Sequence, residues 1–117
     1  MKQVNQRFCL TLDLKDDPAL IEEYRRHHRE FWPEVGACMR ECGILNCELY
    51  QLGTRLMLLL ETTAEFSFEN KARIEQHNPK VLEWEQLMWK FQQPLPGSRP
   101  GEKWILMEQI FKLEPGA

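Results

Sequence analysis

Three residues of this sequence, Tyr24, His28 and Trp32, have types and spacing that suit chemistry. They follow one another at intervals of four, so on a helix they share one face. An imidazole titrates near neutral pH and transfers protons, whereas aromatic rings pack on the C–H groups of a sugar while their polar tips orient its hydroxyls. The spacing therefore predicts a surface for sugar binding and proton transfer. It leaves open the alternative that His28 is a buried histidine hydrogen-bonded to backbone.

Carboxylates are further candidates for acid–base chemistry. Glu108 lies in a predicted strand, as do Asp13, Glu48 and Glu61. A carboxylate that faces an enclosed pocket can act as a base with a raised pKa, although the surface is the ordinary place for such groups.

Cofactor and metal motifs are absent from the sequence. It carries no glycine-rich phosphate loop, nucleophile elbow or dinucleotide fingerprint, and we expect no cofactor. His27 with Glu30 or Glu34 would hold a metal only with further ligands at matched spacing, so we expect no metal either. Cys38 and Cys42 continue an apolar stripe and are expected to be buried thiols.

Length and composition indicate one compact domain over residues 1–117. The formal net charge of −3 provides no positive field for a phosphate backbone, so we expect no nucleic acid partner. No apolar run approaches the roughly 20 residues that span a bilayer, and no secretory signal is found near the N-terminus. We therefore expect no membrane partner and a cytoplasmic location.

The elements that must position the candidate residues begin with a strand over residues 6–14, in which apolar positions alternate. Pro18 follows two aspartates and begins a helix whose apolar positions recur at three and four as far as Cys42. Pro33 cannot donate to the carbonyl of Arg29, so this helix must kink there or restart as a second segment. A kink is expected.

The second half of the sequence predicts a hairpin of strands over 46–51 and 55–61, helices over 66–76 and 79–91, and a last strand over 104–113. The resulting order is the βαββαβ arrangement of a ferredoxin-like α+β fold. The second hairpin strand is apolar on both faces, and one of these faces needs a cover from outside the chain. A second copy that packs sheet against sheet about a two-fold axis supplies it, so we expect a homodimer.

The stretch from Glu23 to Glu34 resembles the Tyr-x-x-x-His-x-x-x-Trp-Pro-Glu signature of the L-rhamnose mutarotase family. The resemblance continues through the predicted hairpin and Trp84 to the end of the last predicted strand at Leu113. It implies a dimeric α+β barrel of ferredoxin-like subunits. It also implies interconversion of the α and β anomers of a 6-deoxyhexose, a small monosaccharide.

Carried over by position, His28 matches the family's proton donor, and Tyr24 matches a tyrosine that contacts the sugar. Trp84 matches the first of two adjacent sugar-contacting tryptophans, but Glu85 replaces the second. Cys47 replaces a sugar-contacting tyrosine at the start of the second strand. The chain therefore resembles the branch that acts on L-fucose more than the L-rhamnose branch, and L-fucose is the first choice of substrate.

The resemblance implies ring opening by acid and base, with His28 as the acid, Tyr24 orienting a hydroxyl, and Glu85 or Glu108 as the base. Two other functions of the same barrel stay open at this stage. One is a small cofactor-dependent oxygenase or heme-degrading enzyme, in which His28 would ligate or orient. The other is a sugar-binding dimer without catalysis.

Overall fold

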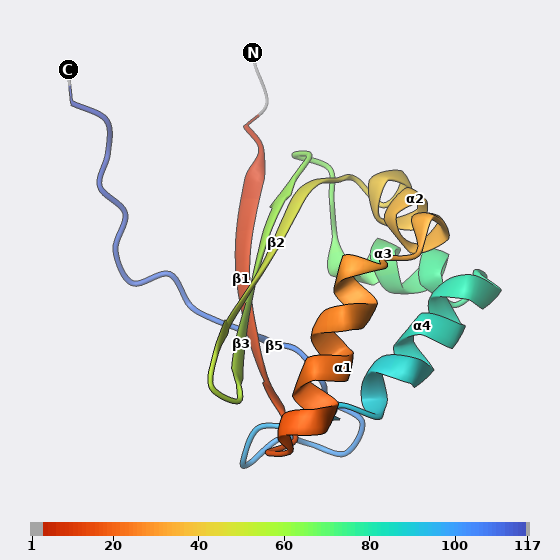
Figure 1. The fold of residues 1–117 in the computed structure, drawn as a ribbon. Helices are drawn as coiled ribbons and strands as arrows, with labels where there is room; N and C mark the ends of the chain where they lie inside the picture. The colour runs from red at the N-terminus through yellow and green to blue at the C-terminus, as the bar shows by residue number, and fades with distance from the viewer. Residues whose placement is uncertain (1–3, 117) are drawn as a thin grey trace.

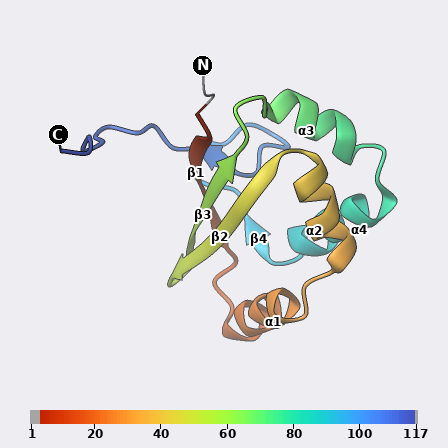
Figure 2. The same cartoon turned by 90° about the horizontal axis from the view of Figure 1, so that it is seen from above.

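The computed structural model describes residues 4–116, in which four helices lie on one side of an antiparallel sheet (Figure 1). Seen from above, the C-terminal end of the chain runs away from the strands on the side opposite the helices (Figure 2). No helix in the described residues is long and apolar enough to cross a membrane. In chain order the elements are β1 (Gln6–Leu14), α1 (Pro18–Arg29), α2 (Pro33–Glu41), β2 (Ile44–Leu52), β3 (Arg55–Thr62), α3 (Phe68–Glu75), α4 (Pro79–Trp89), β4 (Gln92–Gln93) and β5 (Ile105–Leu106).

The central strands of the sheet are β3 and β1. The order across the sheet is β2-β3-β1-β4, and β5 pairs with the same edge of β1 as β4 does. All pairings are antiparallel, which is the ferredoxin-like α+β topology expected from the sequence. The expected first strand, the hairpin and the two later helices are confirmed.

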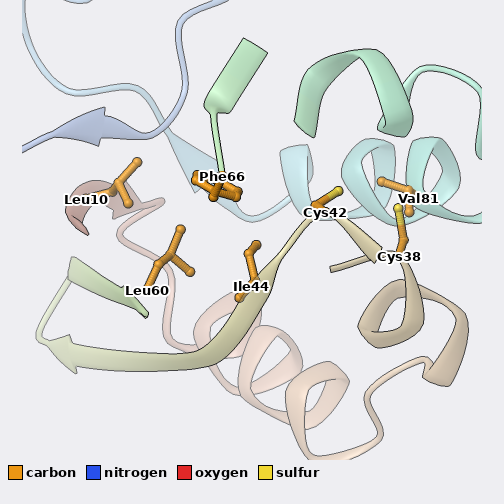
Figure 3. Packing of buried hydrophobic residues seen from close by; sticks show 7 residues of the cluster. All are labelled: Leu10, Cys38, Cys42, Ile44, Leu60, Phe66 and Val81. Carbon is orange, nitrogen blue, oxygen red and sulfur yellow. The ribbon is translucent and has the colours of Figure 1, made fainter. Parts of the chain in front are cut away.

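Alternation along the central strands sends one set of side chains toward the helices. Leu12 and Leu14 of β1 and Leu56 of β3 are almost completely buried on this face. The expected burial of Cys38 and Cys42 is also confirmed. Figure 3 shows the part of this core where side chains from the sheet meet those near α2 and α4: Leu10, Cys38, Cys42, Ile44, Leu60, Phe66 and Val81.

The expectation of one kinked helix is wrong, because the chain forms two helices with a break between them. α1 ends at Arg29 and α2 begins at Pro33. Pro33 has no N–H to bond the carbonyl of Arg29, and in a continuous helix its ring would clash with that carbonyl. The chain instead leaves the helix after Arg29 and restarts with Pro33 in the first turn of α2. Trp32 is extended at φ −75° and ψ 120° and caps α2. His28 and Trp32 therefore do not share one continuous helix face.

The last strand is also shorter than expected. Only Ile105–Leu106 pairs with β1, and residues 107–116, the C-terminal segment, then leave the sheet without regular structure (Figure 1). No helix or second sheet formed by residues 4–116 covers the face of the sheet opposite the helices. Continued pairing of the C-terminal segment with β1 would therefore bury little apolar surface. Three apolar side chains of the segment are 92, 75 and 81 % exposed: Ile110, Phe111 and Leu113.

Candidate active site

Helix α1 holds Tyr24 and His28. The helix starts where the sequence predicts, because the Asp17 side chain accepts hydrogen bonds from the backbone N–H groups of Ala19 and Leu20 at 3.0 and 3.2 Å. One turn apart, the rings of Tyr24 and His28 lie side by side, with centroids separated by 4.5 Å. Tyr24 is buried, and His28 is half-buried.

Trp84 of α4 completes an aromatic cluster around His28. Its ring centroid lies 5.4 Å from that of His28 and 5.2 Å from that of Trp32, in edge-to-face arrangements. Phe31 packs on Trp84 in the same way at 5.2 Å. The structure therefore brings Tyr24, His28, Trp32 and Trp84 together, although Trp32 lies outside α1.

A cavity of about 670 Å³ opens between α1 and the hairpin of β2 and β3. Tyr24, Arg25 and His28 line it from the helix, while Leu49 and Gln51 line it from β2. Its volume lies within the range of roughly 300–1,000 Å³ that is usual for small-molecule sites. The candidate acid–base residue thus faces a space that can hold a monosaccharide.

His28 is held by the carbonyl one turn before it. Its Nδ1 lies 2.9 Å from the backbone oxygen of Tyr24, which can only accept, so Nδ1 carries the hydrogen and donates. In the neutral imidazole this leaves a lone pair on Nε2. Burial lowers the pKa of His28 below its usual 6.5; the hydrogen bond to Tyr24 opposes this shift, and the charge of His27 adds to it. At neutral pH the group is therefore an uncharged base at Nε2.

Tyr24 is a protonated phenol with a polar partner of its own. Nε2 of Gln92, on β4, donates a hydrogen bond to the Tyr24 hydroxyl oxygen at 3.2 Å. Burial raises the pKa of Tyr24 to about 12; the Gln92 hydrogen bond lowers it, and the charges of Glu85 and Cys47 raise it further. The hydroxyl consequently keeps its hydrogen, and can donate it, throughout the physiological pH range.

Cys47 lies on β2, two residues before Leu49 and therefore on the same face of the strand. Part of the residue is open to solvent, yet neighbouring groups desolvate its sulfur enough to raise the pKa of the thiol. Cys47 itself does not line the cavity.

The two candidate carboxylates lie in different places. Glu85 on α4 forms an ion pair with Lys103 at 2.6 Å, and the Lys103 ammonium also lies 5.1 Å from the centroid of the Trp89 ring. Glu108 lies in the C-terminal segment and lines another cavity, of about 520 Å³, against the sheet face that carries no helices. The structure therefore does not bring Glu108 to His28. Among residues 4–116, no three His, Cys, Asp or Glu side chains gather as metal ligands.

Two parts of this site were missed by sequence reasoning. Leu49 and Gln51 line the cavity, and strand alternation from Cys47 provided a usable signal for them. Gln92 lies in the part of the sequence that resembles the L-fucose branch, but its contact with Tyr24 had no local signal, because β4 has only two residues and nothing near Gln92 in sequence marks that contact.

Known proteins resemble this chain in sequence and in fold. An L-fucose mutarotase from Xanthomonas campestris pv. campestris is 46% identical over 110 residues, which cover 92% of this chain and 88% of that protein. The solved structure of an L-rhamnose mutarotase from Formosa agariphila has a TM-score of 0.69 at 17% identity, covering 93% of this chain and 99% of the other. A dimeric ferredoxin-like protein from an uncultured marine organism has a TM-score of 0.52 at 8% identity, covering 97% and 95%.

The solved structures agree with the ferredoxin-like fold, and the sequence similarity narrows it to a family. The family model for L-rhamnose mutarotase matches residues 7–113. This range includes the aromatic cluster, the cavity and both candidate carboxylates. The chain therefore belongs to the L-rhamnose mutarotase family.

Proposed function

We propose that this protein interconverts the α and β anomers of L-fucose, with L-rhamnose as its second substrate. Family membership makes it a sugar mutarotase, and thus an isomerase. L-Fucose is favoured because the relative at 46% identity is named an L-fucose mutarotase. The observation that carries the proposal is the neutral imidazole of His28, whose Nε2 has a lone pair, beside Tyr24 in a cavity of small-molecule size.

Anomer interconversion needs proton transfers alone. When the sugar ring opens, O1 loses its proton, the C1–O5 bond breaks with its electron pair going to O5, O5 gains a proton, and C1 becomes an aldehyde carbon. Rotation about the C1–C2 bond and the reverse steps then give the other anomer. Atoms and electrons balance without an oxidant or a reductant.

His28 and Tyr24 make the two proton transfers. Nε2 of neutral His28 takes the proton of O1, and the Tyr24 hydroxyl donates its hydrogen to O5 as the C1–O5 bond breaks. On closure the His28 imidazolium returns a proton to the carbonyl oxygen, and Tyr24 recovers its proton from O5. In this proposal the acid at the ring oxygen is Tyr24, whereas the family resemblance implied His28 for that role. Positioned proton transfer of this kind contributes about 10²- to 10⁴-fold in rate.

Glu85 is the alternative to His28 as the base, and it is the better placed of the two candidate carboxylates. Its charge raises the pKa of Tyr24, so it lies within electrostatic reach of the site. Glu108, by contrast, lines the cavity on the other face of the sheet. The support for a catalytic carboxylate is therefore stronger for Glu85 than for Glu108.

We also propose that the protein acts as a homodimer. Met57 and Leu59 of β3 lie on the sheet face without helices and are only partly buried, while Ile110 and Phe111 of the C-terminal segment are exposed. Two copies packed about a two-fold axis would remove this apolar surface from water. The dimeric ferredoxin-like protein shares the fold of this chain.

A cytoplasmic location belongs to the same proposal. Its support is the set of unpaired cysteines, which suits a reducing compartment. Detection of the protein in a periplasmic or secreted fraction of its source cells would contradict it. The unpaired cysteines are Cys9, Cys38, Cys42 and Cys47.

The test is exchange NMR of the anomeric protons of L-fucose and L-rhamnose, with the protein and with buffer alone at matched pH. We expect faster α–β exchange of both sugars with the protein, and a larger kcat/KM for L-fucose. Exchange no faster than in buffer would contradict the mutarotase function, and binding without exchange would identify a sugar-binding protein instead. A larger kcat/KM for L-rhamnose would correct the choice of sugar alone.

A further inference from the structure

Gln92 is a buried polar residue whose hydrogen-bonding capacity is only half used. It is 3% exposed, and its Nε2 donates to the hydroxyl oxygen of Tyr24 at 3.2 Å. Its Oε1 is buried too, and no atom of residues 4–116 donates a hydrogen bond to it. Buried amide oxygens almost always have a partner, so one that lacks a partner, on a side chain bonded to the cavity-lining Tyr24, calls for an explanation.

The strand register fixes the direction of this side chain. Gln92 of β4 lies directly opposite Leu14 of β1, and residues paired in this way point to the same face of a sheet. The Leu14 side chain belongs to the buried cluster that also contains Tyr24 and Trp84. The Gln92 amide therefore lies on the helix side of the sheet, in the layer that holds the proposed active site.

The hydrogen bond from Gln92 also determines whether the Tyr24 hydroxyl can act as a donor. Because the hydroxyl oxygen of Tyr24 accepts from Gln92, its own hydrogen is not used in that contact and stays available to donate. The amide N–H also favours negative charge on the phenol oxygen, because the hydrogen bond lowers the pKa of Tyr24. Both effects suit a hydroxyl that gives a proton to the ring oxygen of a sugar.

We infer that Gln92 is a positioning residue for Tyr24 and a contact for the sugar: Nε2 directs the Tyr24 hydroxyl toward O5, and Oε1 accepts a hydrogen bond from a sugar hydroxyl. This inference rests on the proposed mutarotase function. The two atoms have separable effects. Loss of the Nε2 contact misdirects a hydrogen that moves in the transition state and so lowers kcat, whereas loss of the Oε1 contact weakens ground-state binding and so raises KM.

The test uses Gln92→Met, which keeps the length of the side chain and removes both polar atoms. Gln93→Met is the matched control, because Gln93 is the neighbouring residue of β4 and its side chain is exposed. Exchange NMR with L-fucose should show kcat/KM lowered about tenfold or more for Gln92→Met, divided between kcat and KM, and changed less than about twofold for Gln93→Met. Both variants should unfold at temperatures close to that of the wild type.

A double substitution shows whether Gln92 acts through Tyr24. In a Tyr24→Phe background the hydroxyl is gone, so adding Gln92→Met should lower kcat by less than about twofold further. A full additional loss of kcat would overturn the positioning role, and an unchanged KM in Gln92→Met would overturn the sugar contact. Wild-type kinetics in a folded Gln92→Met protein would overturn the whole inference.

Two further outcomes have a defined meaning. If Gln92→Met does not fold, Gln92→Asn keeps a buried amide but withdraws it from Tyr24 by one methylene, and it should lose kcat as well. Wild-type rates in folded Gln92→Asn would overturn the inference. If the wild-type protein itself does not accelerate exchange, the mutarotase function fails and this inference fails with it, a result distinct from an active wild type whose Gln92 variants are unchanged.

Discussion

The backbone carbonyl of Tyr24 decides which end of His28 does chemistry. It holds Nδ1–H and leaves Nε2 as the acceptor. The sequence left two interpretations of His28 open, a histidine hydrogen-bonded to backbone and a proton-transfer group. His28 can be both, because each function uses a different ring nitrogen. This contact also explains how a half-buried imidazole keeps a fixed orientation in a helix.

Replacing His28 by Ala should lower kcat/KM for L-fucose by about 10²- to 10⁴-fold, because both proton transfers at O1 are lost. Exchange NMR measures the change, and thermal unfolding shows whether the fold is kept. His27→Ala is the control, since the His27 ring packs 5.5 Å from Phe91 and does not line the cavity. Wild-type rates in His28→Ala would contradict the mechanism.

The pH dependence of kcat/KM should follow the ionisation of His28. Burial lowers the pKa of His28 below 6.5, and the lone pair on Nε2 exists only above that pKa. The rate above the buffer rate should therefore increase as the pH rises through this lowered pKa, and it should have reached a plateau at neutral pH. A rate that instead falls as the pH rises through this range would mean that His28 acts first as an acid.

Glu85→Gln and Glu108→Gln separate the two carboxylates. Because Glu85 reaches Tyr24 electrostatically and Glu108 does not line the site, Glu85→Gln should change the ratio of kcat/KM for L-fucose to that for L-rhamnose by roughly threefold or more. Glu108→Gln should leave it unchanged. An unaltered ratio in Glu85→Gln would remove Glu85 from substrate choice. Loss of the rise in kcat/KM with pH in this variant would identify Glu85, in place of His28, as the base.

At the scale of elements, the turn from α2 into β2 depends on Gly43. Its φ is +98°, and a Cβ there would lie 2.9 Å from the Oγ1 atom of Thr63. Gly43→Ala should therefore lower the free energy of unfolding by about 2–3 kcal/mol. Gly53→Ala, at φ +59° with nothing within 4 Å of the added Cβ, should lower it by only about 1 kcal/mol. Denaturant unfolding compares them, and equal losses would contradict the steric argument.

Local sequence patterns predicted which helices and strands form. Where two of these elements end depends on contacts between residues far apart in the sequence. The strand over residues 6–14 and the hairpin follow directly from alternation and turn residues. Pro33 marked a disturbance, but whether the helix kinks or restarts depends on packing around Trp32 and Trp84 that no local pattern contains. The last strand stops at Leu106, and its short length has no local signal either, because the apolar residues after it in sequence continue to suit a strand.

The candidate site likewise contains residues that local patterns predicted and one that they did not. Tyr24 and His28 were predictable, because helical spacing alone places them together. Gln92 was not, since it reaches Tyr24 across 68 positions of sequence through a two-residue strand. Residues joined by sheet topology need the fold before their roles can be assigned.

At the scale of the whole molecule, the open sheet face and the C-terminal segment predict association. Size-exclusion chromatography with light scattering should give twice the chain mass of 14.0 kDa at micromolar concentration. Phe111→Asp should shift the protein toward the monomer, because a carboxylate would replace an apolar side chain in the contact. Lys112→Asp, which changes charge without removing apolar surface, serves as the control. A monomeric wild type would refute the proposed dimer.

The aromatic cluster gives this molecule an optical readout of its own chemistry. Imidazolium quenches indole emission more strongly than neutral imidazole, and the Trp84 ring lies 5.4 Å from that of His28. Trp32 and Trp84 are also close enough, at 5.2 Å, for their excited states to couple. Tryptophan fluorescence should therefore follow the protonation of the proposed catalytic base, and circular dichroism the contact between the two indoles. Both signals need neither a label nor a sugar.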